Sequence, residues 1–278
     1  MPHNRLYISA DIEGIAGVVS GEHTMPAGFE YNQAREWMTN EVLAACSAAF
    51  DNGIKDIVIS DSHGNGQNLL LDRLPTGTQL VRSWPRPLCM MEGVDQGKFD
   101  AALLIGYHAS ATHQQGVLAH TLHGKGIVEV KINGRSASET FISAATAGHF
   151  GVPVILASGD DAYAQHTQEL FDDIEAVTVK WAHSTTSART LLPQDACEII
   201  YQQTDRALKR LQDFKPFVVG DSPILVDVNC VSRRAAELLC FMAMFRRISA
   251  TQVAFEADTM VDVSKVLSFL VASGTLMV

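Results

Sequence analysis

Three features that would point to familiar protein classes are missing from this 278-residue sequence: a long apolar run, a basic cluster and paired cysteines. A transmembrane helix needs about 20 consecutive apolar residues, and no stretch reaches that length. The Lys and Arg residues are scattered and the formal net charge is −10, whereas nucleic acids and anionic membranes require clustered cations. We therefore expect neither a nucleic acid nor a membrane among the partners of this protein.

The five cysteines form no C-x-x-C motif, and their odd number and irregular spacing are typical of reduced, mostly buried thiols. The first residues also lack the pattern of a signal peptide, because the first apolar segment is short and ends in an acidic residue. Both observations predict a cytoplasmic protein.

Two common catalytic motifs are missing as well. The sequence has no Gly-x-Ser-x-Gly motif, which argues against a serine hydrolase of the α/β-hydrolase type. The glycines at 64 and 66 are not followed by the lysine of a phosphate-binding P-loop. What the sequence does contain is an ordinary globular composition, 47% hydrophobic and 19% charged, which is sufficient for a core without disulfides.

Strand and helix patterns alternate through the first two thirds of the chain. Short apolar or β-branched strands are expected at residues 6–10, 57–60, 101–105, 127–132, 154–157 and 177–180. Helices are expected at residues 32–52, with Asn32 as the N-cap, and at 139–150 and 161–171. The alternation predicts an α/β fold with a largely parallel sheet and flanking helices. Asn133-Gly134 after the fourth strand is a strong hairpin signal.

The last third begins with a Ser/Thr-rich stretch at residues 183–190 and then changes its pattern. The expected elements are a helix at 194–212, a strand at 224–228, a helix at 233–245, a strand at 252–256 and a helix at 259–271. We interpret this part as a smaller C-terminal α+β domain. The predicted division is a metal-binding catalytic α/β domain at residues 1–182 and the smaller domain at 183–278.

Acidic residues and histidines directly follow three of the predicted strands. Asp11 and Glu13 follow the first strand, and residues two apart in an extended segment project to the same side. His63 follows the second strand and His108 the third. An acid after one strand is commonly a cap or turn residue. Because the carboxyl ends of parallel strands line one ligand crevice, the coincidence at three strand ends makes a catalytic zinc or manganese site as well supported as separate caps and turns.

These residues also resemble the D-aminopeptidase family, peptidase family M55. The resemblance rests on the run Ser9-Ala10-Asp11-Ile12-Glu13-Gly14, on Asp61-Ser62-His63 and on Gly106-Tyr107-His108-Ala109. Further matches are Met91-Glu92-Gly93, Gly116-Val117-Leu118-Ala119-His120, Ile132-Asn133-Gly134, Gly159-Asp160-Asp161 and Val179-Lys180. The matching segments occur in the right order up to about residue 190, and the last third matches only in general pattern.

The resemblance implies a dinuclear zinc centre, with another divalent metal as the alternative. Asp11 would bridge the two ions, and His120 corresponds to the catalytic histidine of the family. The five implied metal ligands are Asp11, Glu13, His63, His108 and Glu139. Glu13 and His63 would complete one metal site, and His108 and Glu139 the other. The family also implies a ring-shaped homo-oligomer, for which a decamer is one candidate size.

The predicted function is that of a dinuclear zinc-dependent aminopeptidase. It would hydrolyse the amide bond after a free N-terminal amino acid in short peptides or amino-acid amides, and the resemblance alone implies the D-configuration. One alternative is an L-amino-acid amidase or other amidohydrolase on the same centre. A dinuclear phosphoesterase is disfavoured because only Arg82 and Arg86 lie in a suitable loop. A non-catalytic metal-bound peptide-binding protein would not need His120 as a proton carrier or oxyanion donor.

Several polar residues near these motifs remain open at this point. His113 and His123 flank His120 in a loop expected over the site. They are expected to be surface loop residues, with assistance in catalysis as the alternative for one of them. Asp61 is expected to orient a histidine or cap a turn. Asp160 and Asp161 follow a predicted strand and are expected either to recognise an amine or to cap the next helix. The sequence does not indicate a role for Lys180.

Overall fold

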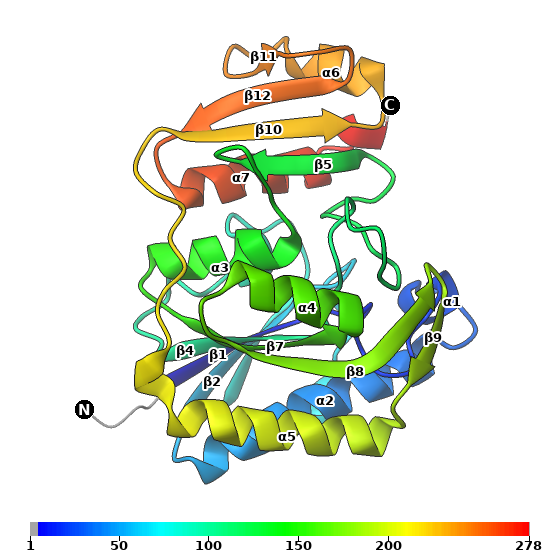
Figure 1. Cartoon of the computed structure of the whole chain (residues 1–278), viewed down its shortest axis with the longest axis vertical. Helices are drawn as coiled ribbons and strands as arrows, with labels where there is room; N and C mark the ends of the chain where they lie inside the picture. The colour runs from blue at the N-terminus through cyan, green and yellow to red at the C-terminus, as the bar shows by residue number, and fades with distance from the viewer. Residues whose placement is uncertain (1–4, 278) are drawn as a thin grey trace.

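The structure of the protein, a computed structural model, describes residues 5–277 and contains two β-sheets that are separated and flanked by helices (Figure 1). The first sheet has the strand order β3-β2-β1-β4-β7-β8-β9. Its strands are β1 (Arg5–Ala10), β2 (Asp56–Asp61), β3 (Thr78–Val81), β4 (Ala101–Ile105), β7 (Val154–Asp160), β8 (Glu175–Ser184) and β9 (Ser187–Thr190). Neighbouring strands are parallel except at the edge, where β9 is antiparallel to β8. The predicted α/β class with a largely parallel sheet is therefore confirmed.

Helices cover both faces of the first sheet (Figure 1). The elements around it are α1 (Gly21–Thr24), α2 (Tyr31–Asp51), α3 (Glu139–His149), α4 (Asp161–Leu170) and α5 (Pro193–Lys209). Alternate residues of β1 enter different cores: Leu6 and Ile8 pack with α2 and α5, whereas Tyr7 packs with α3 and α4. Because both faces of the sheet are buried, successive residues of the central strands are mostly apolar rather than alternating between apolar and polar.

The second sheet is antiparallel and has the strand order β11-β12-β10-β5-β6. Its strands are β5 (Ile127–Ile132), β6 (Arg135–Ser136), β10 (Ile224–Cys230), β11 (Arg246–Arg247) and β12 (Gln252–Ala257). Val226 and Val228 on its buried face share a core with α6 (Arg233–Leu239) and α7 (Met260–Ala272). Helix α7 lies between this sheet and α3, so it joins the two halves of the molecule (Figure 1).

The α+β character of the C-terminal part is confirmed, but its sheet also contains an earlier segment. Strands β5 and β6 precede residue 183 and pair with β10. Helix α5 follows residue 183 and packs on the core of the first sheet. The two sheets therefore do not follow the chain order, and the domain division at residue 183 stays a prediction.

Several element boundaries differ from the sequence prediction. The helix expected at 233–245 ends at Leu239, and α2 begins at Tyr31 after Glu30, so Asn32 is not its N-cap. The Ser/Thr-rich stretch at 183–190 forms the β8–β9 hairpin of the first sheet. The Asn133-Gly134 turn is confirmed, with φ of 50° and 76°. Short 3-10 helices occupy Leu71–Arg73, Cys89–Met91, Leu211–Asp213 and Thr275–Met277.

Across residues 5–277, no helix is both long enough and apolar enough to cross a membrane. The cytoplasmic location expected from the sequence stays a prediction.

Candidate metal centre

The three strands that carry the predicted ligands lie side by side at the centre of the first sheet. In the parallel register, Ala10 of β1 pairs with Asp61 of β2 and with Ile105 of β4. The segments that follow therefore emerge together at one edge. Hydrogen bonds continue the sheet past the strand ends, from the Asp11 amide to the Ile105 carbonyl (2.8 Å) and from the Ser62 amide to the Ala10 carbonyl (2.8 Å).

Two glycines allow the segment after β1 to cross closely over the end of β4. The Gly14 amide donates to the Gly106 carbonyl at 2.7 Å. A Cβ atom at Gly14 would lie 1.9 Å from the Tyr107 carbonyl oxygen, so no larger residue fits there. Gly106 adopts a φ of +72°, a conformation that glycine reaches without steric strain. This crossing places Asp11 and Glu13 beside His108.

The first group of candidate ligands consists of Asp11, Glu13 and His63. Nδ1 of His63 lies 2.9 Å from Oε2 of Glu13 and 3.2 Å from Oδ1 of Asp11. Both carboxylates are buried, with exposed fractions of 2% for Asp11 and 5% for Glu13. The predicted ligands of one metal site thus converge in the fold.

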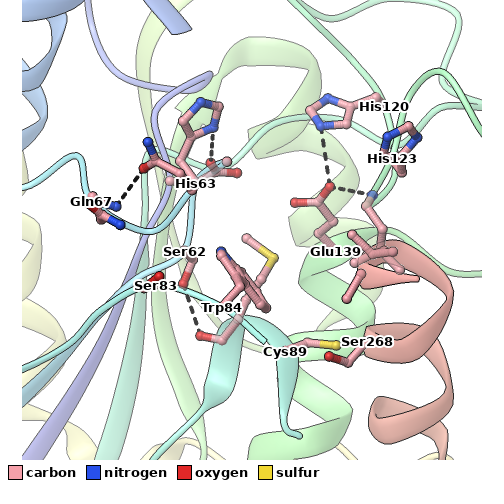
Figure 2. A pocket seen from close by; sticks show the side chains of 17 residues that line it. Ser62, His63, Gln67, Ser83, Trp84, Cys89, His120, His123, Glu139 and Ser268 are labelled. Carbon is pink, nitrogen blue, oxygen red and sulfur yellow. Dashed lines mark hydrogen bonds and ion pairs between the residues drawn. The ribbon is translucent and has the colours of Figure 1, made fainter. Parts of the chain in front are cut away.

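The second group consists of His108, His120 and Glu139. Nε2 of His108 lies 3.3 Å from Oε2 of Glu139 and 3.4 Å from Oδ2 of Asp11. Nε2 of His120 lies 3.7 Å from Oε1 of Glu139, and its ring stacks on His108 with centroids 4.1 Å apart. Asp11 therefore turns one oxygen toward each group. His120, predicted as the catalytic histidine, belongs by position to the second group (Figure 2).

Each histidine of the site is oriented by a backbone carbonyl. Nε2 of His63 donates to the Thr24 carbonyl, Nδ1 of His108 to that of Ala109 and Nδ1 of His120 to that of Leu118, each at 2.9 Å. A carbonyl only accepts, so these nitrogens carry the protons. In a neutral imidazole the other nitrogen then presents its lone pair to a carboxylate. Such second contacts are typical of metal-binding histidines.

Lone pairs that face buried carboxylates need a cation between them. Oε2 of Glu13 and Nε2 of His108 are buried without a hydrogen-bond partner. Burial disfavours charge on His63, but Glu13 and Asp11 outweigh it and hold the pKa of the imidazole well above its usual range. Burial likewise opposes charge on His108, yet Glu139 raises its pKa to about 10. The donors thus fit positive charge, supplied either by protons or by metal ions.

The three carboxylates respond differently to this environment. Burial and the neighbouring Glu13 raise the pKa of Asp11 to about 7. Burial alone would raise the pKa of Glu13, but His63 outweighs it and holds that pKa well below its usual range. Glu139 is the first residue of α3, where Ser138 is the N-cap, and its Oε1 accepts from the Leu122 amide at 2.7 Å. The position near a helix N-terminus also favours its negative charge.

A buried lysine fixes the loop that carries Glu13. Lys180 of β8 is fully buried, and its Nζ donates to the carbonyls of Glu13, Ile15 (3.0 Å) and Val18 (2.6 Å). Oε1 of Glu41 in α2 accepts from the Ala16 amide of the same loop at 2.8 Å. The role that the sequence left open for Lys180 is therefore structural: it binds the backbone of the loop that carries a ligand.

The remaining aspartates of the matching motifs also hold loops. Asp61 accepts from the backbone of Asn68 and Leu69, which confirms that it stabilises a turn. Asp160 caps α4 and also accepts from the Val117 amide at 2.6 Å. Asp161 accepts from the Ala182 amide at 2.8 Å. Their carboxylates are thus engaged by backbone amides.

The two arginines considered for a phosphoesterase do not supply a free cation at the centre. Arg86 is 2% exposed, and its guanidinium donates to the Ser83 carbonyl, the Ser60 hydroxyl and the Asp61 carbonyl. Arg82 is exposed and does not line the pocket beside the metal ligands. The phosphoesterase alternative thus loses the residues that favoured it.

A pocket of about 480 Å³ opens beside both ligand groups. His123 lines it together with His120, whereas His113 does not. Sequence reasoning missed most of its wall because the wall comes from distant segments, including Trp84 after β3 and the end of α7. Further lining residues are Cys89, Met90, Leu122, Ser268, Val271 and Ala272 (Figure 2).

Carboxylates and imidazoles at the strand ends of a parallel sheet, next to a pocket, are typical of metal-dependent hydrolases. The sequence model of the D-aminopeptidase family matches residues 4–269. A D-aminopeptidase of Bacillus subtilis (strain 168) is 30% identical over 259 residues, which are 93% of each chain. The chain therefore belongs to the D-aminopeptidase family and is an amide-bond-hydrolysing metallo-aminopeptidase.

The similarity extends to the whole structure. The solved structure of the Zn-dependent D-aminopeptidase DppA from Bacillus subtilis, described as a self-compartmentalizing protease, matches with a TM-score of 0.92. The sequences are 28% identical, and the match covers 98% of both chains. The family resemblance inferred from the sequence is thus confirmed, including the last third of the chain.

Proposed function

We propose that this protein is a dinuclear zinc aminopeptidase that releases an N-terminal D-amino acid from short peptides or amino-acid amides. The observation that carries the proposal is the orientation of Asp11. Its two oxygens face separate groups of donors, 3.2 Å from Nδ1 of His63 and 3.4 Å from Nε2 of His108. A carboxylate between two such groups is suited to bridge two cations.

The charges of the site support two ions over one. Asp11, Glu13 and Glu139 bring up to three negative charges into a buried region, and the ligand histidines His63 and His108 are neutral when they bind metal. Two divalent cations would nearly neutralise this set. Carboxylate and imidazole ligands suit zinc, and the relative DppA is named as zinc-dependent.

Zinc ions bound here would polarise the scissile carbonyl and lower the pKa of a water molecule. Glu13 and Glu139 would balance the charge of the ions, and Lys180 would hold the loop of Glu13 in place. The free amino group of the substrate would bind one of the metal ions or pair with an acidic side chain. Anchoring the amino group in this way would place the first peptide bond at the metal centre, so that cleavage releases a single N-terminal residue. The names of both relatives support the D-configuration.

His120 is placed to act on the substrate as well as near the metal. Its side chain is 26% exposed and lines the pocket, while the Leu118 carbonyl fixes its Nδ1 proton. Nε2 is then free to carry a proton to the leaving amine or to stabilise the oxyanion. We assign it to catalysis, with metal binding as the competing role to be tested.

We also propose that the chain assembles into a closed homo-oligomeric ring. The support is the description of DppA as a self-compartmentalizing protease together with the match over nearly the whole chain. The number of subunits, for which ten is a candidate, would follow from the solution mass divided by 30.2 kDa.

The central experiment measures turnover of D-Ala and L-Ala p-nitroanilides by the purified protein, the chelated protein and the zinc-restored protein. His120→Ala is assayed in parallel, and zinc per chain is measured for every sample. We expect two zinc ions per chain, cleavage of the D-substrate and its loss on chelation. His120→Ala should retain both ions and lose activity by about 10²- to 10⁴-fold, the range for a general acid or base.

Other outcomes would change specific parts of the proposal. Cleavage of the L-substrate alone would preserve the metal hydrolase and remove the D-specificity. Loss of one zinc ion in His120→Ala would make His120 a ligand. Two bound ions without cleavage of either substrate would favour other amides or a peptide-binding role.

A further inference from the structure

The wall of the pocket contains a hydrogen-bond donor that the protein does not use. Nε1 of Trp84 is buried and has no hydrogen-bond partner among the described residues. The indole nitrogen is a donor only, so it is satisfied only by an acceptor. A buried donor without a partner is unfavourable, which makes this nitrogen a position where a ligand oxygen would be bound.

The indole ring is held in a fixed orientation. Its edges pack into both cores that flank the pocket, and the guanidinium of Arg86 lies over the ring at 4.5 Å. Arg86 is itself immobilised by Ser60 and the backbone. Because these contacts restrain the partly buried ring, its N–H is pre-organised for an acceptor, which lowers the entropic cost of binding.

The donor stands in the same pocket as the ligand groups. Trp84, His63 and Glu139 all line it, and the nitrogen edge of the indole is turned toward the space between His63 and Glu139 (Figure 2). Around the ring the lining is largely apolar and includes Met90, Leu122 and the end of α7. A substrate held at the ligands therefore extends past an isolated N–H group.

We propose that Nε1 of Trp84 binds the first acceptor beyond the scissile bond, the carbonyl or carboxylate oxygen of the second residue of the peptide. The inference rests on the proposed function, in which the metal centre engages the scissile carbonyl and the amino group. The oxygen of the second residue is then the next acceptor along the substrate. An amino-acid amide has no such oxygen, so Trp84 favours dipeptides over simple amides.

The test compares D-Ala-D-Ala with D-alaninamide as ligands of the zinc-loaded His120→Ala protein, with and without Trp84→Phe. Calorimetry gives the two dissociation constants. We expect Trp84→Phe to weaken dipeptide binding about tenfold more than alaninamide binding, the effect of one well-placed hydrogen bond. In the protein with His120 intact, the ratio of kcat/KM for the two substrates should change by the same factor.

Two further variants separate the hydrogen bond from packing. Trp181→Phe is the matched control, since Trp181 also lies under an arginine at 4.5 Å, in β8, outside the pocket. It should leave the ratio unchanged. Trp84→His retains an N–H donor on a five-membered ring and should restore part of the dipeptide preference.

The outcomes are distinguishable from those of the proposed function. Equal weakening of both ligands, or none, would overturn the role of Trp84, as would failure of the dipeptide to bind the zinc-loaded protein. If dipeptide binding depends on Trp84 but neither compound is cleaved by the protein with His120 intact, the inference stands and the aminopeptidase assignment fails.

Discussion

At the scale of single residues, the site is organised by what its histidines do with their two nitrogens. His63, His108 and His120 each donate one N–H to a backbone carbonyl and direct the other nitrogen toward a carboxylate. This arrangement fixes the ring orientation before any ligand binds. The carboxylates favour positive charge on these imidazoles, so protons and metal ions compete for the same nitrogens.

Asp11 provides the sharpest residue-level prediction. Asp11→Asn replaces one of the two oxygens that face the ligand groups by an amide nitrogen and removes the negative charge they share, whereas Glu13→Gln affects the first group only. We expect Asp11→Asn to retain less than one zinc ion per chain after dialysis, and Glu13→Gln to retain about one. Inductively coupled plasma mass spectrometry measures both. Two ions retained in Asp11→Asn would exclude the bridging role.

At the scale of elements, candidate ligands lie at the strand ends, but side chains from other elements fix the position of the loop that carries two of them. The loop after β1 is bound by Lys180 from β8 and by Glu41 from α2. Burial lowers the pKa of Lys180 to about 8, and the facing Asp160 and Glu41 partly oppose that shift. The ligand-bearing loop thus depends on two buried side chains from two distant elements, each hydrogen-bonded to its backbone.

Glu41 makes the stability of this arrangement dependent on pH. Burial raises the pKa of Glu41 from 4.5 to about 7. Below pH 4.5 the carboxyl is neutral in both the folded and the unfolded state. Between pH 4.5 and about 7 the unfolded chain releases the proton first, so the free energy of unfolding falls as the pH rises. The loss from this group amounts to about 3 kcal/mol at about 1.4 kcal/mol per pH unit.

Glu41→Gln should remove this loss, because glutamine retains an oxygen for the Ala16 amide but does not ionise. Chemical denaturation at pH 5 and pH 8 with saturating zinc gives the free energy of unfolding at each pH. We expect its decrease from pH 5 to pH 8 to be smaller in the variant by about 3 kcal/mol. Glu36→Gln on the same helix is the control, since its ion pair with Arg73 is exposed. Equal pH dependence in Glu41→Gln and the unmodified protein would contradict the prediction.

At the scale of the whole molecule, the pocket is formed between the strand ends of the first sheet and α7, which packs on the second sheet. The first sheet supplies the ligand groups, and α7 of the second half supplies Ser268, Val271 and Ala272. Cys89 beside the pocket donates to the Ser264 carbonyl of α7, which attaches the wall to the loop after β3. The C-terminal part thus contributes directly to the space available for a substrate.

A bulky residue in the α7 wall of the pocket should reduce the length of peptide that the pocket accepts. Ala272→Trp would fill the outer part of the pocket, and we expect kcat/KM for a tripeptide to fall at least about tenfold more than that for an amino-acid amide. Lys265→Trp on the exposed side of α7 is the control. Kinetics with D-Ala amide, dipeptide and tripeptide test this. A uniform loss across the three substrates would show that Ala272 does not limit substrate length.

Much of the first sheet and four candidate ligands, Asp11, Glu13, His63 and His108, were predictable from local sequence signals, whereas Glu139 was implied only by the family resemblance. Acids and histidines after apolar strands indicate one sheet edge, because parallel strands end together. Trp84 and α7 were not predictable as pocket walls, since nothing local to them indicates a ligand. The expected helix at 233–245 was wrong beyond Leu239. The following residues form a turn from which Phe245 packs into the core of the second sheet, whereas Phe241 and Met244 are exposed.

The sequence alone determined the class of fold, through short-range periodicity, and the family, through the resemblance of its motifs. It predicted four candidate ligands from residue types at strand ends and Glu139 from the resemblance. Only the tertiary structure decided that β5 joins β10, that Lys180 binds the loop of Glu13 and that α7 closes the pocket. Those contacts join segments far apart in the chain. They depend on how the two sheets pack against α3 and α7, which no local pattern encodes.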